Sequence, residues 1–492
     1  MVDLRQLPLD PAADRPVYRQ LADALRAMIE RETLRSGDKL PPTRQLAEQL
    51  GLNRTTVSAA YSLLEQSGLI HGHVGRGSFV ARSASRTSSS QRNWEAILPP
   101  VETVSSPAPK IDISFASSRP AAHDFPVADF RRVTKQVVDS PETGEILQLG
   151  SSYGYAPLRR YLLDQAMASG VARHSDDIII TNGCQQALDL IARVFVARNT
   201  GVLVEDPGYH GVLRLFSRAG SETVSANVDD AGIDPDAIEQ VLERSRPRLM
   251  VITPSFQNPT GVTLPLERRR RIVSLAERSG CVLVENDMYR ELRYTGTDVP
   301  ALKELDDTGN TILLRSYSKV CFPGLRVGWV IAPRPVIARL AEAKEICDLH
   351  SDQLSQAVLL GFAESGELAR HIERTRRAGA ERLNAVLNAC ARYLPKGTRF
   401  TRPQGGMNLW IDLPAPLTAD TLLSRVQERG VNFLPGRYFS ARHSHGRGLR
   451  ISFGGLSPGQ ITRGFQILGE AIKRELAASV SSEDLEPAAA LV

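Results

Sequence analysis

At 492 residues the chain is too long for a single ordinary domain, and two or three domains are expected. Its apolar content of 42% is enough for packed cores, and its charged content of 23% is ordinary for a globular protein. The net charge of +5 permits DNA binding but does not by itself indicate it.

The cysteines indicate neither a metal site nor a disulfide framework. Cys184, Cys281, Cys321, Cys347 and Cys390 follow no metal-ligand or paired spacing, so we expect reduced thiols and no bound metal. The first residues lack the apolar stretch of a signal peptide, and no apolar run approaches membrane-spanning length. We therefore expect a cytoplasmic protein without a membrane partner.

Composition divides the chain into five parts. Residues 1–13 form an N-terminal arm, and residues 14–81 form a first compact unit. Residues 82–110 are rich in serine, arginine and proline, which predicts a flexible linker; an ordered arm packed on the body is the alternative. Residues 111–475 form a large body, and the small, acidic residues 476–492 are expected to be a disordered tail.

The first compact unit carries the signals of three helices and a hairpin. Apolar residues between Val17 and Ile29 share one helical face. Thr43 is suited to cap a second helix, which stops at Gly51, and Asn53 is suited to cap a third. Two strand-like runs within 69–80 then predict a β-hairpin wing.

This order of elements predicts a winged helix-turn-helix domain that binds double-stranded promoter DNA. A recognition helix presents short polar and basic side chains at its N-terminal end, where it meets base edges and phosphates. We assign that role to Arg54, Thr55, Thr56 and Ser58. Further DNA contacts are expected from Arg44 in the preceding helix and from Gly75 and Arg76 at the wing tip. The alternative is that these arginines are solvated surface charges.

The body alternates short apolar runs with helical patterns, which predicts an α/β fold with a mostly parallel sheet covered on both faces. From about Ala378 the pattern changes to a smaller α+β unit. The strands are expected at 178–181, 202–205, 249–253, 282–285 and 312–315, with helices such as 185–196 and 266–279.

The segment Ser316-Tyr-Ser-Lys319, directly after an expected strand, can anchor pyridoxal 5'-phosphate (PLP). PLP chemistry needs a lysine for the covalent link, and Lys319 is the candidate. Ser316, Ser318 and Arg326 are suited to hold the phosphate, because charge-assisted donors favour it. An ordinary surface lysine is the alternative.

The ring of such a cofactor needs its own partners. Asp287 follows the strand 282–285 and is expected to hold the pyridine nitrogen protonated; a turn aspartate is the alternative. Tyr289 and Asn258 are suited to bond the phenolic oxygen, although Asn258 in Asn-Pro-Thr-Gly is also ordinary turn chemistry. Tyr209 is expected to stack on the ring, with a plain core tyrosine as its alternative.

Two further groups complete the predicted site. Gly183, Cys184 and Gln185 open a helix after a strand, where backbone N–H groups form an anion site for the phosphate. Arg450 is a candidate clamp for the carboxylate of a substrate or effector, although a strand arginine can simply pair with an acid.

These motifs carry a resemblance to known families. Residues 14–81 resemble the winged helix-turn-helix domain of the GntR family, and residues 111–475 resemble fold-type I aminotransferases, in the order Gly-Cys-Gln-Gln, Asp-Pro-Gly-Tyr, Asn-Pro-Thr-Gly, Asp-x-Tyr, Ser-x-Ser-Lys-x6-Arg and Arg-Ile-Ser-Phe. The whole chain is similar to MocR-type regulators. That resemblance implies a head-to-tail homodimer and PLP held as an aldimine on Lys319.

Three positions depart from the pattern of the resembled family. Leu149 stands where many relatives have a tyrosine that reaches the neighbouring subunit's phosphate. Cys184 replaces a hydroxyl or small residue. Asn286 stands where relatives often have the first of two aspartates, so either Asn286 or Asp287 faces the pyridine nitrogen.

The leading hypothesis is a PLP-dependent transcriptional regulator. It would bind promoter DNA and sense PLP, or an amino acid or amine effector, through the aldimine at Lys319. The first alternative is an active PLP-dependent aminotransferase with an appended DNA-binding domain. The second is a DNA-binding protein whose body no longer binds the cofactor, against which Lys319, Tyr289 and Arg326 argue.

Overall fold

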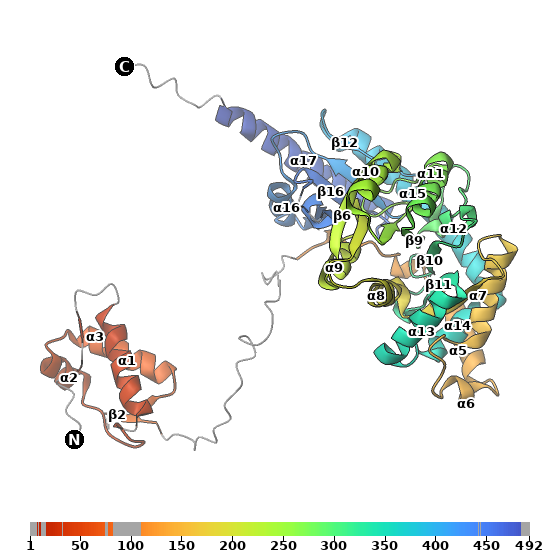
Figure 1. Ribbon diagram of the computed structural model, residues 1–492. Coiled ribbons are helices and arrows are strands. Elements are labelled where there is room, and N and C mark those ends of the chain that lie inside the picture. The colour runs from red at the N-terminus through yellow and green to blue at the C-terminus, as the bar shows by residue number, and fades with distance from the viewer. Residues whose placement is uncertain are drawn as a thin grey trace. The chain divides into compact units, whose positions relative to one another are not determined.

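The chain forms two compact units, Met1–Val104 and Ser105–Val492 (Figure 1). The computed structural model describes residues 7, 9–10, 16–31, 33–73, 77–81, 110–440, 442 and 444–483. The division between the units falls inside the segment expected to be a linker.

The first unit is a three-helix domain with a hairpin. Helices α1 (Val17–Glu30), α2 (Thr43–Leu50) and α3 (Arg54–Gln66) precede the antiparallel strands β1 (Ile70–His73) and β2 (Gly77–Val80). Its core contains Leu21, Leu25, Leu46, Val57, Leu64, Ile70 and Val80, all buried. The predicted winged helix-turn-helix fold is therefore confirmed.

The helix ends of this unit agree with two of the three predicted caps. Asn53 Oδ1 accepts a hydrogen bond from the Thr55 N–H at 3.2 Å, and Gly51 ends α2 with a left-handed φ of 66°. Thr43 is not a cap, because α2 begins one residue earlier than predicted and its N-cap is Pro42. Proline holds its φ near the helical value, so the helix starts directly behind it without a side-chain cap.

The second unit is built on an eight-stranded sheet with the order β4-β11-β10-β9-β8-β5-β6-β7. Strands β10, β9, β8, β5 and β6 are parallel, whereas β11 and β7 run antiparallel to their neighbours. The mostly parallel sheet predicted from the apolar runs is thus confirmed. The strand bounds are β4 Asp176–Thr181, β5 Gly201–Asp206, β6 Glu222–Asp229, β7 Gly232–Ile233, β8 Leu249–Ile252, β9 Val282–Asn286, β10 Thr311–Ser316 and β11 Gly328–Pro333.

Helices cover both faces of this sheet because successive strand residues point to opposite sides. Ile179 packs on one face under α8 (Gly183–Phe195), α9 (His210–Arg218) and α13 (Arg334–Asp348), whereas Ile178 and Ile180 face α7 (Ala156–Ala168). The second face is completed by α10 (Pro235–Ser245), α11 (Leu266–Ser279) and α14 (Gln353–Glu364). The remaining short or peripheral elements are α5 Val127–Val138, α6 Thr143–Ile146, α12 Leu302–Leu305, η1 Ala122–Asp124, η2 Arg290–Leu292 and η3 Pro323–Leu325.

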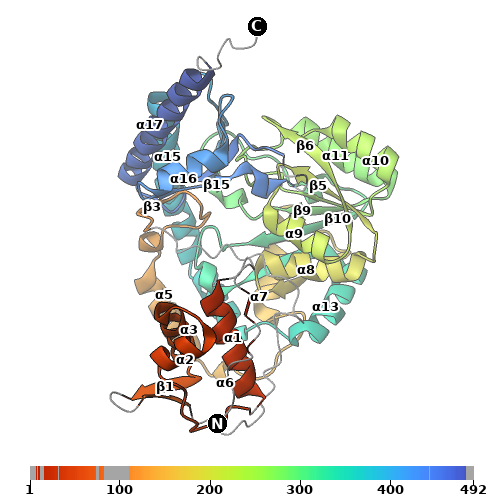
Figure 2. The same cartoon turned by 90° about the vertical axis from the view of Figure 1, so that its left-hand side faces the viewer.

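A smaller part of the second unit packs three helices on a four-stranded sheet, as Figure 2 shows for α15, α16 and α17. The helices are α15 (Glu367–Tyr393), α16 (Ala419–Gln427) and α17 (Pro458–Glu483). The strands lie in the sheet in the order β12 (Arg399–Phe400), β13 (Asn408–Asp412), β16 (Gly448–Ser452) and β15 (Leu434–Pro435). The short helix η4 (Gly436–Phe439) directly follows β15 in the chain. This α+β part begins with α15, somewhat before the expected Ala378.

Helix α17 runs past residue 475, where the body was expected to end, and continues to Glu483. Leu468 and Ile472 of this helix are fully buried in the small core, and α17 packs along α15. Packing of one face against a partner helix stabilises a helix whose composition alone does not favour order. The predicted tail from residue 476 is therefore wrong for residues up to Glu483.

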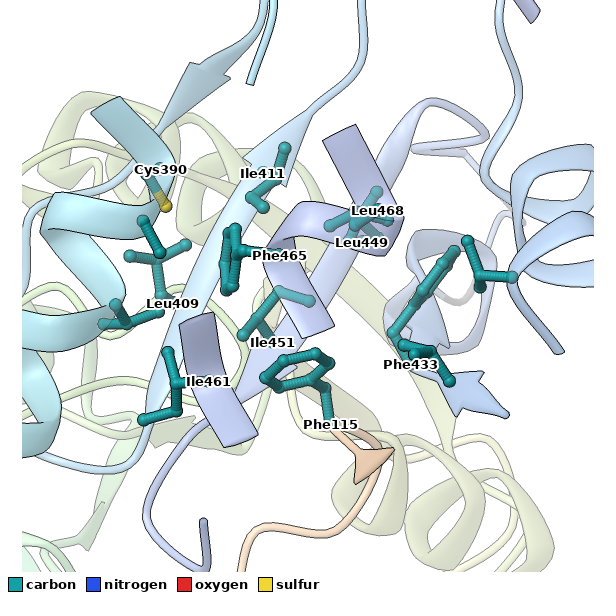
Figure 3. Packing of buried hydrophobic residues seen from close by; sticks show 14 of the residues in the cluster. Phe115, Cys390, Leu409, Ile411, Phe433, Leu449, Ile451, Ile461, Phe465 and Leu468 are labelled. Carbon is teal, nitrogen blue, oxygen red and sulfur yellow. The ribbon is translucent and has the colours of Figure 1, made fainter. Parts of the chain in front are cut away.

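The first residues of the second unit also belong to this small core. Strand β3 (Ile113–Ser114) pairs in parallel with β14 (Val431–Asn432), more than three hundred residues later in the chain. Phe115 follows β3 and is fully buried, with its ring 5.5 Å from the ring of Phe465 in an edge-to-face contact (Figure 3). This anchor fixes the start of the body, and with it the residues that come next.

Replacement of Phe115 by alanine is expected to lower the free energy of unfolding of the second unit by about 3–5 kcal/mol, the range for a buried aromatic ring. Urea titration followed by tryptophan fluorescence measures the change, since Trp410 lies on β13 of the same small sheet. Phe400→Ala, at the half-buried edge strand β12, is the matched control and should cost clearly less. Equal losses in the free energy of unfolding of the two variants would show that the burial of Phe115 does not stabilise the second unit more than an edge residue does.

Within the described ranges, no helix combines the length and the apolar character needed to cross a membrane. In the same part of the chain, no three His, Cys, Asp or Glu side chains are grouped as a metal ion would require.

Candidate cofactor site and DNA-reading helix

The loops that follow the parallel strands meet at one edge of the large sheet. Strands β4, β5, β8, β9 and β10 run in the same direction, so their carboxyl ends share that edge. Ligands of open α/β sheets bind in the crevice outside such strand ends. The segments that begin there carry the predicted site residues, which explains how positions far apart in sequence come together.

A cavity of about 250 Å³ lies at this edge and holds several of the predicted residues. Its walls come from the end of β9, from the loops after β5, β8, β9 and β10, from the segment after β3, and from β15 and β16 of the small sheet. The residues that line it are Ala116, Ser117, Ser118, Tyr209, His210, Thr253, Asn258, Asn286, Met288, Tyr289, Lys319, Leu434 and Arg450.

Lys319 projects into this cavity. Its Nζ donates a hydrogen bond to the backbone oxygen of Ser118 at 2.7 Å and lies 5.5 Å from the centre of the Tyr289 ring. Burial alone would raise the pKa of the Tyr289 hydroxyl, but Lys319, a hydrogen bond with Ser118 and Arg450 together hold it below its ordinary value. The tyrosine is thus prepared to carry negative charge or to give up a proton beside the lysine amine.

Arg450 lies across the cavity from the sheet and is almost completely buried. Its Nη1 donates to Asn258 Oδ1 at 3.0 Å, its Nη2 donates to the backbone oxygen of Ala116, and burial lowers its pKa to about 10. No carboxylate pairs with it among the described residues. A buried guanidinium held by neutral oxygens is suited to accept a ligand carboxylate.

The helix start at Gly183 forms a cradle with Arg326. A Cβ atom on Gly183 would lie 2.6 Å from Arg326 Nη2, so only glycine lets the guanidinium approach the first turn of α8. Gly183 also has a φ of +76°, a conformation that L side chains rarely adopt. A helix N-terminus beside an exposed guanidinium is an arrangement suited to an anion such as a phosphate.

The other residues predicted to bind the phosphate differ in how free their side chains are. Ser316 is committed elsewhere, because its hydroxyl donates to Val327 O at 2.8 Å and accepts from the Ser318 N–H at 3.0 Å. Cys184 is buried, and burial raises the pKa of its thiol to about 12, so it stays neutral beside the cradle. Gln185 is exposed on α8, and Ser318 is half-buried beside Lys319.

The two consecutive candidates for the ring nitrogen are separated by the structure. Asn286 lines the cavity with Lys319. Asp287 does not; it lines a neighbouring cavity of about 460 Å³ and pairs with Arg315 at 3.0 Å. The role expected for Asp287 therefore conflicts with its position.

Tyr209 and His210 form a further wall of the cavity. Burial raises the pKa of Tyr209, which keeps its ring neutral and suited to stacking. Burial and then the cation of Arg450 lower the pKa of His210 to about 4, so the imidazole is neutral at physiological pH. Sequence analysis did not single out His210, although it directly follows Tyr209.

Ala116 and Ser118 were also missed by sequence analysis. The backbone oxygens of Ala116 and Ser118 accept from Arg450 and Lys319 respectively, and the Ser118 hydroxyl also bonds the Tyr289 hydroxyl at 3.4 Å. A backbone acceptor leaves no signature in the side chains, and the contact with Lys319 spans about two hundred residues of sequence. Only the anchoring of Phe115 in the small core brings them to the cavity.

PLP fits this group of residues. A lysine amine, a tyrosine with a lowered pKa and a guanidinium without a carboxylate partner among the described residues line one cavity, and Gly183 and Arg326 form a separate cradle at the start of α8. In addition, Asn286 Oδ1 is buried and has no hydrogen-bond partner among the described residues. Bound PLP supplies the electrophilic aldehyde and the conjugated ring; Lys319, the Gly183–Arg326 cradle and Tyr209 would hold it.

Two carboxylates are buried beneath the site. Glu205, at the end of β5, accepts hydrogen bonds from the Thr253 N–H and from Gln257 Nε2, each at 3.2 Å. Burial raises its pKa from 4.5 to about 8. In the same layer, burial raises the pKa of Glu285.

The folded protein is therefore expected to lose stability as the pH rises from about 5 to about 8. The folded-state pKa of Glu205 lies above the ordinary value, so its contribution is full below pH 4.5 and lost as the pH approaches 8. Glu205→Gln should flatten this part of the stability curve, measured as the urea midpoint against pH. Glu222→Gln, on the exposed end of β6, should leave the slope unchanged. If the urea midpoint of Glu205→Gln changes with pH as steeply as that of the unmodified protein, Glu205 is not protonated in the folded protein.

In the first unit, the predicted DNA-reading residues lie at the N-terminal end of α3. Arg54 and Thr55 are exposed, and Thr56 and Ser58 are half-buried. Arg44 is exposed on the first turn of α2. Neither guanidinium forms an ion pair within the part of the unit that the structure describes, so both are available to phosphates or base edges. Gly75 and Arg76, predicted for the wing tip, lie outside the described residues.

Comparison with protein families gives two matches. Residues 113–468 match the class I and II aminotransferases, and residues 17–80 match the bacterial regulatory proteins of the gntR family. The first match covers most of the chain.

Individual relatives divide into enzymes and regulators. The 2-aminoadipate transaminase of Thermus thermophilus is 38% identical over 74% of this chain and 91% of its own length. The probable rhizopine catabolism regulatory protein MocR of Rhizobium meliloti is 30% identical over 94% of this chain and 95% of its own length.

Solved structures agree with the fold. Kynurenine aminotransferase of Pyrococcus horikoshii has a TM-score of 0.75 at 31% identity, covering 79% of this chain and 100% of that enzyme. The α-aminoadipate aminotransferase LysN of Thermus thermophilus, complexed with N-(5'-phosphopyridoxyl)-L-leucine, has a TM-score of 0.70 at 38% identity, with 74% and 93% covered. These matches confirm the predicted fold type and PLP as the cofactor of the family. The chain belongs to the class I and II aminotransferase family and carries a gntR-family DNA-binding domain in front, the architecture of MocR-type regulators.

Proposed function

We propose that this protein is a PLP-dependent transcriptional regulator that binds promoter DNA and senses PLP or an amine through Lys319. The single observation that carries the proposal is the Lys319 amine in a cavity with Tyr289, Asn258 and Arg450, in a chain that also has a DNA-reading helix. Neither feature alone supports sensing. The location that fits this role is the cytoplasm.

Lys319 Nζ would hold PLP through its aldehyde carbon, and the cofactor would supply an electrophile for which the primary amine of an effector competes with the lysine. An effector carboxylate would bind Arg450, whose Nη2 is otherwise bonded to Ala116 O. An amino acid therefore fits the cavity better than a simple amine does.

The contacts of Ala116 and Ser118 support a link to the DNA-binding unit. These residues follow β3, and the chain that precedes β3 leads directly to the first unit. Both contacts, Lys319 with Ser118 O and Arg450 with Ala116 O, involve groups that the ligands would engage. A ligand shifts a protein between two states only by its differential affinity for them, and competition for these two contacts supplies such a difference.

The partner that we propose for full activity is a second copy of the chain, arranged head-to-tail. Leu147, Leu149, Ile346 and Leu349 are large apolar side chains that are well exposed in the single chain. Leu349 follows Asp348, which bonds Asn182 beside the phosphate cradle. Exposed apolar side chains, one of which follows a residue that bonds Asn182, support a dimer whose subunits meet near the cofactor site.

The experiment that tests the proposal is a titration of the PLP-loaded protein with amino acids and simple amines, followed by visible absorbance. A lasting band shift is expected with at least one amino acid, and it should be smaller with the matching decarboxylated amine. A protein that takes up no PLP would overturn the proposal.

Transamination is a second candidate function. It is favoured by a cavity that keeps Asn258, Tyr289 and Arg450 beside the lysine, and by the identity of 38% to a transaminase. Slow decay of the shifted band to the pyridoxamine form would reveal it in the same titration.

A further inference from the structure

Two consecutive residues at the end of strand β9 could face the ring nitrogen of a bound cofactor. Which of them does so affects whether the site only exchanges amines or also transaminates them. Asn286 is the last residue of β9, and the Asp287 N–H extends the ladder by donating to Leu314 O at 3.0 Å. Successive residues of an extended strand point to opposite sides. Only one of the two side chains can therefore face the cavity of Lys319, and that side chain is Asn286.

Asp287 is held on the other side by a cation of its own. Its side chain is fully buried, and its Oδ2 accepts from Arg315 Nη2 at 3.0 Å. The pair lines the neighbouring cavity with Tyr317 and Glu291. Breaking a buried ion pair leaves an uncompensated charge and is strongly unfavourable, so Asp287 does not turn toward Lys319.

Within the described part of the chain, Asn286 is a buried amide with no ion pair, and one of its polar atoms is unpaired, as is Asp287 Oδ1. The residue is 3% exposed, and its Oδ1 has no partner among the described residues. The NH2 group of such an amide can donate to an unprotonated pyridine nitrogen, whereas its oxygen could accept only from a protonated one. The amide can present its oxygen or its NH2 group, but neither carries a charge.

We infer that Asn286 is the partner of the pyridine nitrogen and that this nitrogen is unprotonated in the bound cofactor. The inference deepens the proposed function and rests on it. A carboxylate would stabilise the protonated ring, whereas the neutral amide of the buried Asn286 does not offset the desolvation of that charge. An unprotonated ring withdraws electrons weakly, so loss of the α-proton from a bound amino acid is slow. Exchange of the amine at Lys319 does not need that proton to leave.

The direct test is nitrogen-15 NMR of the full-length protein loaded with PLP labelled at the ring nitrogen. The protein is expected to show the signal of an unprotonated pyridine near neutral pH. Asn286→Asp should move the signal far upfield, to the position of a pyridinium ion, and should speed conversion of a bound amino acid to its keto acid by about 10²-fold. Asp287→Asn should leave the signal in place.

A second variant keeps the test sound if Asp287→Asn fails to fold. The double variant Asp287→Asn with Arg315→Gln removes both members of the buried pair and leaves no lone charge behind. A pyridinium signal in the unmodified protein that moves downfield in either of these variants would overturn the inference and assign the role to Asp287. Failure to retain labelled PLP after desalting would instead overturn the proposed function, so the two failures are distinguishable.

Discussion

Lys319→Ala is expected to abolish the covalent attachment of PLP and the response to amines while the protein stays folded. Among the described residues, the Lys319 amine forms one hydrogen bond, to Ser118 O, and loss of one such bond costs about 1 kcal/mol. Borohydride reduction followed by mass spectrometry measures the attachment. The unmodified protein should carry a stable adduct on the peptide that contains Lys319, and the variant should carry none.

Lys135→Ala is the matched control for this experiment. Lys135 lies on an exposed face of α5 and pairs at the surface with Asp139 at 2.6 Å. Its loss should change neither the adduct nor the amine response. Regulation that still responds to amines in Lys319→Ala would contradict a covalent sensor, even if PLP remained bound without the link.

Arg54→Ala is expected to weaken DNA binding by about 1–3 kcal/mol, the range for an arginine that reads a base edge, which corresponds to about 5- to 150-fold in Kd. Arg54 is exposed at the first position of α3, and the Asn53 cap fixes the start of that helix. Fluorescence anisotropy with a DNA fragment selected by the protein from a random library, repeated at several salt concentrations, measures both affinity and salt dependence. The absorbance of bound PLP should not change.

Arg31→Ala provides the comparison, since Arg31 is an exposed arginine at the end of α1, outside α2 and α3. This variant tests whether the loss of DNA affinity comes from the position of Arg54 or from the removal of one positive charge. If Arg54→Ala binds as tightly as the unmodified protein, or if both variants lose affinity equally, α3 is not the recognition helix.

Local patterns were sufficient to predict much of this molecule. Strands β4, β5, β8, β9 and β10 contain short apolar runs, and each is followed by a segment that carries a site residue, so the meeting of these residues at one edge follows from the common direction of the strands. The caps at Gly51 and Asn53 are likewise local signals. Lys319, Tyr289 and Asn258 could therefore be assigned to one cavity before the structure was known.

The rest depends on contacts that no local pattern encodes. The choice between Asn286 and Asp287 is set by which side of β9 each faces, and a shift of one residue would reverse it. The order of α17 beyond residue 475 comes from packing on α15, and the role of Ala116 and Ser118 comes from the burial of Phe115. The hydrogen bond from the Ser316 hydroxyl to Val327 O is a further example, because Val327 lies eleven residues later, directly before β11.

The most direct test of the whole account compares two signals in one titration of the PLP-loaded protein. An amino acid that shifts the visible absorbance is added stepwise while the anisotropy of the selected DNA fragment is recorded. The account predicts that the affinity for DNA changes over the same range of amino-acid concentration as the absorbance, and that Lys319→Ala shows neither change. If the absorbance shift saturates while the affinity for DNA and the protected DNA segment stay the same, the result would contradict this account. Cofactor chemistry and DNA binding would then be independent.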